Sequence, residues 1–149
     1  MRSIRSKWLA LVAGVALAAA PALSVRAAAA SDNFSGIWRV TVTPDHAGAQ
    51  AGQQRFEELI LFEQGVLSAE ACAAYGFAPS QYVVADAGGS FSTSMSSETH
   101  GTIVWSGSLT GGLIRGQVVW TKPDGDVFHY SMSASRNVVA EDAPSESDG

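Results

Sequence analysis

Residues 102–135 read TIVWSGSLT-GG-LIRGQVVWT-KPDGD-VFHYSMSAS, and this stretch decides the fold. Apolar and polar residues alternate in each of its three long segments, which is the pattern of a strand with one buried face. The pair Gly111-Gly112 and the Pro-Asp-Gly sequence at 123–125 are typical hairpin and turn formers. We therefore predict a three-stranded antiparallel meander with one apolar face. That face carries Ile103, Trp105, Leu109, Ile114, Val118, Trp120, Phe128, Tyr130 and Met132.

Shorter segments before the meander show the same alternation. They predict strands over residues 36–43, 54–62, 81–85 and 90–96, with a loop over 44–53. Between the second and third of these, an alanine-rich segment starts at Ser68 and stops at Gly76. Ser68 suits a helix cap, and Gly76 suits a helix end. We predict one short helix near residues 69–75.

Seven to eight consecutive short strands joined by tight links are compatible with only a few architectures. Closing such a sheet on itself removes its exposed edges, and eight strands give an interior that side chains can fill. An immunoglobulin-like sandwich is the alternative, but its crossovers have no counterpart in the last three strands. The prediction is an all-β, antiparallel up-and-down barrel over residues 31–136, interrupted by the short helix.

The two ends of the chain differ in residue composition from the predicted barrel. Residues 1–30 combine early positive charges, an apolar run and four closing alanines, which is typical of a secretory signal peptide and too short in its apolar core for a permanent span. We expect export to the periplasm or outside the cell. Residues 137–149 are acidic and rich in serine, and we expect a disordered tail.

Charge excludes some partners. Without the leader, five basic residues remain against fourteen acidic ones, a net charge of −9. Five scattered cations cannot form a nucleic-acid-binding face, and anionic membrane surfaces are disfavoured for the same reason. We expect neither nucleic-acid binding nor stable membrane insertion, and the oligomeric state stays open.

The ends of the predicted domain resemble a known family. Phe34-Ser-Gly-Ile-Trp38 resembles the Gly-x-Trp opening of lipocalins and related calycin barrels, and Arg136 resembles the arginine that closes them. The meander 105–120 also looks like that of small exported bacterial lipocalin-like proteins of unassigned function. The resemblance implies that Arg136 stacks on Trp38 across the barrel base. Biotin-contacting residues of the avidin branch are not matched, so biotin binding is not implied.

A barrel with inward aromatic side chains favours non-catalytic binding of a small apolar or amphipathic ligand. The helical segment is either a lid over that site or a plug inside the barrel. The rival function is a filled barrel acting as a cell-envelope interaction or structural module, and an open cavity of about 300 Å³ or more would favour the binder. The residues predicted to hold the ligand are Tyr75, Phe77, Tyr82, Trp105, Trp120 and Tyr130.

Other reactive side chains give no catalytic or metal pattern. Cys72 is alone and lacks a recognisable histidine partner, so we expect a buried small hydrophobe rather than a nucleophile. His46, His100 and His129 are too far apart in sequence for a zinc motif. Glu58 lies among apolar neighbours, so it either faces inward with a partner or turns outward at a bulge. We expect no catalytic residue, no metal and no cofactor.

Overall fold

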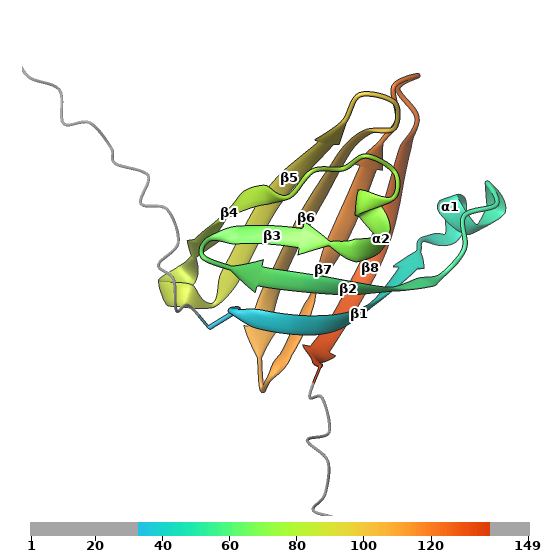
Figure 1. The fold of residues 1–149 in the computed structure, drawn as a ribbon. Coiled ribbons are helices and arrows are strands. Elements are labelled where there is room, and N and C mark those ends of the chain that lie inside the picture. Colours follow the sequence, from blue (N-terminus) through green and yellow to red (C-terminus); the bar gives the residue numbers. More distant parts are fainter. Residues whose placement is uncertain (1–32, 138–149) are drawn as a thin grey trace, which may run out of the picture.

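The computed structural model describes residues 33–137, which form a closed barrel of eight antiparallel strands (Figure 1). Each strand pairs with the next along the chain, and the last returns to pair with the first. The predicted all-β up-and-down barrel is confirmed. The predicted signal peptide over residues 1–30 and residues 138–149 of the predicted tail lie outside the described residues. The strands are β1 (Gly36–Pro44), β2 (Phe56–Glu63), β3 (Val66–Ala69), β4 (Ser80–Ala85), β5 (Ser90–Ser97), β6 (Gly101–Thr110), β7 (Leu113–Thr121) and β8 (Val127–Arg136).

The alternation read from the sequence sets which side chains fill the barrel. Trp38, Val40 and Val42 of β1 are fully buried, and the inward residues of the meander are buried or half-buried. The opposite faces of the same strands point outward and carry mostly polar side chains that are exposed or half-buried. Hydrophobic burial on one side of each strand and hydration of the other therefore fix the register, because a slip by one residue would exchange the two faces.

Two elements differ from the sequence prediction. A strand that was not predicted, β3 (Val66–Ala69), takes up the predicted cap Ser68 and the first predicted helical residue, Ala69, and the helix that follows, α2 (Glu70–Ala73), is correspondingly short. Gln64 and Gly65 both adopt positive φ in the tight turn before β3, although glutamine is a poor marker of such turns. The predicted loop over 44–53 contains a second helix, α1 (His46–Gln50), whose first turn is capped by Asp45.

The remaining helical turn, η1 (Asp86–Gly88), joins β4 to β5. Within residues 33–137, no helix is long and apolar enough to cross a membrane.

Successive connections alternate between the two ends of an up-and-down barrel. The β2–β3, β4–β5 and β6–β7 turns lie at one end of the barrel, together with the start of β1 and the end of β8, and we call this end the base (Figure 1). Helices α1 and α2 and the connections before β6 and β8 lie at the opposite end, which we call the mouth.

Aromatic rings fill the base. Phe62 lies at the centre, with its ring centroid 4.9 Å from those of Tyr82 and Phe91 and 5.6 Å from that of Phe34. Glycine leaves room for this cluster on β6, since a Cβ on Gly107 would lie only 3.1 Å from a ring carbon of Phe91. The base is therefore packed by the protein's own side chains.

Arg136 closes the base from outside. Its guanidinium carbon lies 4.5 Å from the ring centroid of Trp38, so the contact implied by the family resemblance is present. The same guanidinium donates to the carbonyl oxygens of Ser35 at 2.7 Å and Asn33 at 2.9 Å. The indole N–H of Trp38 donates to the carbonyl of Phe34 at 2.7 Å. One arginine and one tryptophan thus tie the segment before β1 to the end of β8.

We predict that Arg136→Lys lowers the free energy of unfolding by about 1–2 kcal/mol, because lysine keeps the charge but loses the planar fork that reaches two carbonyls. Trp38→Ala should cost about 3–5 kcal/mol through lost burial. Urea denaturation measures both changes. Arg115→Lys, on the exposed face of β7, is the matched control and should change stability by less than about 0.5 kcal/mol. Equal effects at Arg136 and Arg115 would contradict the closing role.

Candidate functional site

A cavity of about 500 Å³ opens at the mouth of the barrel. It is bounded by the inner faces of β6, β7 and β8, by the start of β2 and by α2. Its buried wall is apolar and aromatic apart from Glu58, whereas its other polar residues are half-buried or exposed near the rim. The lining residues are Gln53, Gln54, Arg55, Phe56, Glu57, Glu58, Ala71, Cys72, Tyr75, Phe77, His100, Ile103, Trp105, Val118, Trp120 and Tyr130.

Five of the six predicted ligand residues line this cavity: Tyr75, Phe77, Trp105, Trp120 and Tyr130. Tyr82 does not line it. It is 1% exposed and packs edge-on against Phe62 in the base cluster. The alternation in the sequence predicts that Tyr82 faces inward, but it does not predict where the side chain lies between the base and the mouth.

The wall of the cavity contains two indoles with different surroundings. Trp105 is fully buried and projects inward from β6. Trp120 of β7 is half-buried, and its Nε1–H donates to the carbonyl of His100 at 2.7 Å. Trp105 Nε1 is buried and has no hydrogen-bond partner.

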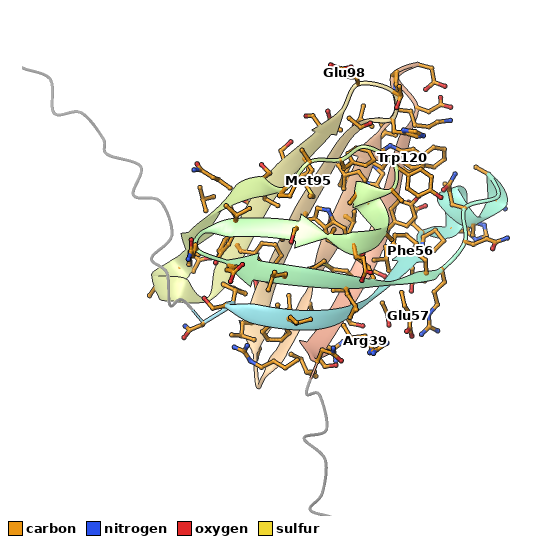
Figure 2. All side chains as sticks on the ribbon, in the orientation of Figure 1. Arg39, Phe56, Glu57, Met95, Glu98 and Trp120 are labelled. Carbon is orange, nitrogen blue, oxygen red and sulfur yellow. The ribbon has the colours of Figure 1, made fainter. Side chains whose placement is uncertain are left out.

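The rim is built by side chains from several connections. Figure 2 shows Phe56 and Trp120 at the end of the barrel that carries α1 and α2. The rings of Tyr75 and His100 meet at 5.3 Å, and the phenol of Tyr130 donates to Gln53 Oε1 at 2.8 Å. Burial, and then the neighbouring Asp45, raise the pKa of Tyr130, so its phenol keeps the proton that it donates.

Helix α2 supplies part of the cavity wall through Ala71 and Cys72. It packs against β2 and β3, beside the opening. The segment is therefore neither a plug that fills the barrel nor a lid that covers the whole mouth.

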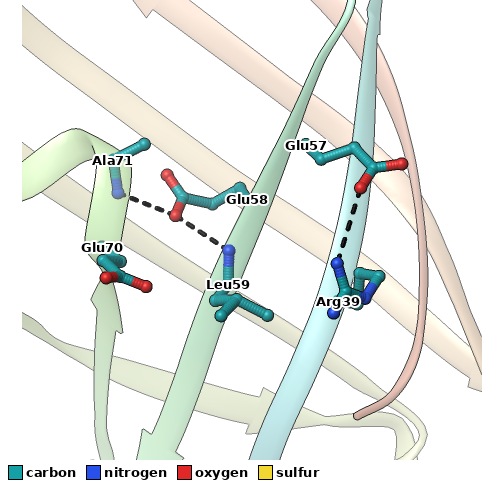
Figure 3. A pocket seen from close by; sticks show the side chains of 6 residues that line it. All are labelled: Arg39, Glu57, Glu58, Leu59, Glu70 and Ala71. Atoms are coloured by element: carbon teal, nitrogen blue, oxygen red, sulfur yellow. Dashed lines mark hydrogen bonds and ion pairs between the residues drawn. The ribbon is translucent and has the colours of Figure 1, made fainter.

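Glu58 explains how α2 is held there (Figure 3). Its side chain is 3% exposed and faces inward, so the strand has no bulge that turns it out. One carboxylate oxygen accepts from the backbone N–H of Leu59 at 2.9 Å and of Ala71 at 2.8 Å. The other accepts from the N–H of Cys72 at 3.2 Å. Glu58 thus caps α2 from a neighbouring strand, whereas Ser68, the predicted cap, makes no such contact and the cap position is Ala69.

A second, shallower hollow between β1, β2 and α2 is drawn in Figure 3. Arg39 and Glu57 form an ion pair across it at 3.6 Å, with both side chains more than half exposed. Exposed pairs of this kind contribute little to stability. The hollow contains no aromatic side chain, so it lacks the apolar wall of the mouth cavity.

Cys72 is buried, and its thiol is unreactive at neutral pH. Desolvation by burial, followed by the charge of Glu58 and a thiol hydrogen bond to it, raises the pKa of Cys72 from 9.0 to about 12. Since the thiolate is the reactive form, the thiol is a poor nucleophile at neutral pH.

The three histidines lie apart in the structure. His46 contacts Gln50 on α1 at 3.0 Å, His100 lies at the rim, and His129 is exposed on β8. Over residues 33–137, no group of three side chains suited to a metal ion comes together.

We predict that Glu58→Gln lowers the free energy of unfolding by about 1–3 kcal/mol, because one acceptor of backbone N–H groups is replaced by a donor. Thermal or urea unfolding measures the change. Glu57→Gln is the matched control on the exposed face and should cost less than about 0.5 kcal/mol. If the two substitutions cost the same, the capping role of Glu58 is wrong.

A second prediction follows from the raised pKa of Cys72. As pH rises from about 9 toward about 12, the unfolded chain loses the thiol proton while the folded chain retains it, so the free energy of unfolding falls. The contribution is at most about 1.4 kcal/mol per pH unit. Urea denaturation across this range should show a shallower decline for Cys72→Ala. Identical slopes in the two proteins would contradict the pKa shift.

No protein-family model matches the chain, and no curated protein is found to be similar to it. Because a barrel fold by itself hosts many functions, the geometry and chemistry of the mouth cavity are the guide to what this protein does.

Proposed function

We propose that this protein binds a small apolar or amphipathic molecule in the mouth cavity, without catalysis. One observation carries the proposal: a cavity of about 500 Å³ with an aromatic wall and a polar rim. Small-molecule sites typically enclose roughly 300–1,000 Å³ and have this distribution of apolar and polar groups.

Burial of the ligand's apolar surface would supply the affinity, at about 0.8 kcal/mol for each CH₂ group that leaves water. The walls are strands of a closed sheet, and the rim is held by hydrogen bonds such as Tyr130 to Gln53 at 2.8 Å. A preformed site of this kind needs little reordering on binding, so less of the interaction energy is lost.

The lining residues also support binding rather than catalysis. The carboxylate of Glu58 is engaged by three backbone N–H groups, and the raised pKa of Cys72 keeps its thiol protonated. Among the residues that line the cavity, these two do not form the activated nucleophile and base that covalent catalysis requires.

The rival function, a filled barrel acting as an interaction module, has less support. Aromatic side chains fill the base, but the cavity at the mouth exceeds the roughly 300 Å³ at which binding is favoured.

Two further parts of the proposal concern the structural class and the cellular location of the protein. The Trp38–Arg136 contact at 4.5 Å is compatible with a calycin-type barrel, and we place the protein in that class as a proposal. We also propose export, directed by residues 1–30. Burial of Cys72 fits an oxidising compartment, since a protonated and buried thiol reacts slowly.

We predict that Ala71→Trp blocks the site, because Ala71 lines the cavity and an indole there would occupy ligand volume. Isothermal titration calorimetry with isopropylnaphthalene, an uncharged apolar probe, should show affinity reduced at least roughly tenfold, a loss of about 1.4 kcal/mol. Ala73→Trp, on the same helix but outside the cavity lining, should bind as the unaltered protein does.

Native mass spectrometry of the protein purified from its own host would test the same proposal without a chosen probe. A retained small molecule that is released on denaturation is the expected result. Failure to bind any apolar probe, together with no retained molecule, would contradict the proposed function.

A further inference from the structure

Charge is distributed unevenly between the two ends of the described barrel. The cavity lining and the connections at the mouth together hold seven acidic side chains and two basic ones, a net charge of −5. The acidic residues are Asp45, Glu57, Glu58, Glu70, Glu98, Asp124 and Asp126, and the basic residues are Arg55 and Lys122. The other charged side chains of residues 33–137 lie in the half of the barrel nearer the base and sum to +1: Arg39, Glu63, Asp86, Arg115 and Arg136. The mouth is therefore the negative end of this part of the chain.

The negative charge at the mouth is only partly balanced by ion pairs. Within residues 33–137 the ion pairs are Arg39 with Glu57 at 3.6 Å and Lys122 with Asp124 at 3.8 Å. Neither includes Glu58, which lines the cavity and is 3% exposed. Its carboxylate need not touch a ligand to attract a cation, because charges act over several ångströms where little water separates them. A hollow surrounded by one sign of charge concentrates ligands of the opposite sign.

Aromatic rings at the same opening can receive a cation. Tyr75 and Phe56 both line the cavity, and they are 58% and 37% exposed, so a ligand can reach them. The chain's own ammonium group already contacts aromatic surface at this end. Nζ of Lys122 lies 5.9 Å from the ring centroid of Trp120, a lining residue, and 5.7 Å from that of Phe128. Cations within about 6 Å of an aromatic face are attracted by the ring quadrupole.

We infer that the ligand is a cationic amphiphile, with an apolar body inside the mouth cavity and an ammonium group at the opening, against the exposed rings of Tyr75 and Phe56. This inference rests on the proposed function, since it assigns a chemical class to the molecule in that cavity. Arg55 is the basic side chain among the lining residues, and it is exposed near the rim. One exposed cation does not offset the surrounding carboxylates, so an anionic ligand would be repelled.

Three probes with the same ring system, point of substitution and tetrahedral end group separate a cationic from a neutral or anionic ligand. Naphthylmethyl-trimethylammonium carries a positive charge that does not titrate. Neopentylnaphthalene has the same shape with carbon in place of the charged nitrogen, and naphthylmethanesulfonate carries a negative charge. By isothermal titration calorimetry at low salt, the ammonium probe should bind roughly tenfold more tightly than neopentylnaphthalene. The sulfonate should bind the most weakly of the three.

Salt separates the electrostatic attraction from the apolar contact in the unsubstituted protein. Raising the NaCl concentration from about 0.01 M to about 1 M shortens the Debye length from roughly 30 Å to 3 Å. Affinity for the ammonium probe should fall severalfold across this range, whereas affinity for neopentylnaphthalene should not fall. An affinity for the ammonium probe that is independent of salt would overturn the role of the negative mouth.

Two pairs of variants locate the effect. Tyr75→Leu removes an exposed ring and should reduce the preference for the ammonium probe over neopentylnaphthalene roughly threefold, whereas Tyr75→Phe keeps the ring and the preference. Glu98 and Glu63 are both exposed, but Glu98 lies in the connection before β6 at the mouth (Figure 2) and Glu63 lies at the base. At low salt, Glu98→Gln should weaken binding of the ammonium probe about twofold, and Glu63→Gln should not. Thermal melts establish that the variants are folded.

The three probes also distinguish failure of this inference from failure of the proposed function. Equal affinity for the ammonium probe and neopentylnaphthalene, or tightest binding of the sulfonate, would overturn the cationic class while leaving the proposed function intact. Unchanged preference in Tyr75→Leu would overturn the place assigned to the ammonium group. Binding of none of the three would contradict the proposed function itself.

Discussion

Pairing of β1 with β8 is the constraint on which the rest of the structure depends. It joins the two ends of the described chain through a register that runs from Trp38 opposite Arg136 to Pro44 opposite Tyr130. Without it the sheet would have two open edges and no enclosed interior. The guanidinium of Arg136 strengthens the same junction by bonding the carbonyls of Asn33 and Ser35. Closure therefore creates both the base cluster and the cavity.

The interior is divided along the barrel axis. At the base, inward aromatic rings meet edge to face at about 5 Å and leave no room for a ligand. At the mouth, residues of α2 and of the rim connections line a cavity together with the strands. Glu58 connects β2 to α2, because its carboxylate accepts hydrogen bonds from the first backbone N–H groups of that helix. Burial of the Glu58 carboxylate is unfavourable by itself, and the three backbone N–H groups that donate to it offset this penalty.

Local patterns predicted most strands and the faces of their side chains, since alternation and turn residues act within a few positions. They failed where a longer-range contact decides the conformation. β3 has only four residues and is stabilised by pairing with β2 and β4 on either side. The first N–H groups of α2 are capped by Glu58, and not by Ser68, the capping residue predicted from the local sequence. Tyr82 was assigned to the cavity because inward direction is visible in sequence, whereas position along the axis is not.

Periodicity and turn chemistry in the sequence determined an antiparallel barrel and its inward residues. These features depend on residue type and short spacing, so they are present in the linear chain. Tertiary structure alone decided that the base is filled and the mouth is hollow, that Glu58 caps a helix, and that one of three described indoles lacks an acceptor. Those outcomes depend on strand stagger and on contacts between residues far apart in sequence, which bring particular atoms within or beyond hydrogen-bond distance.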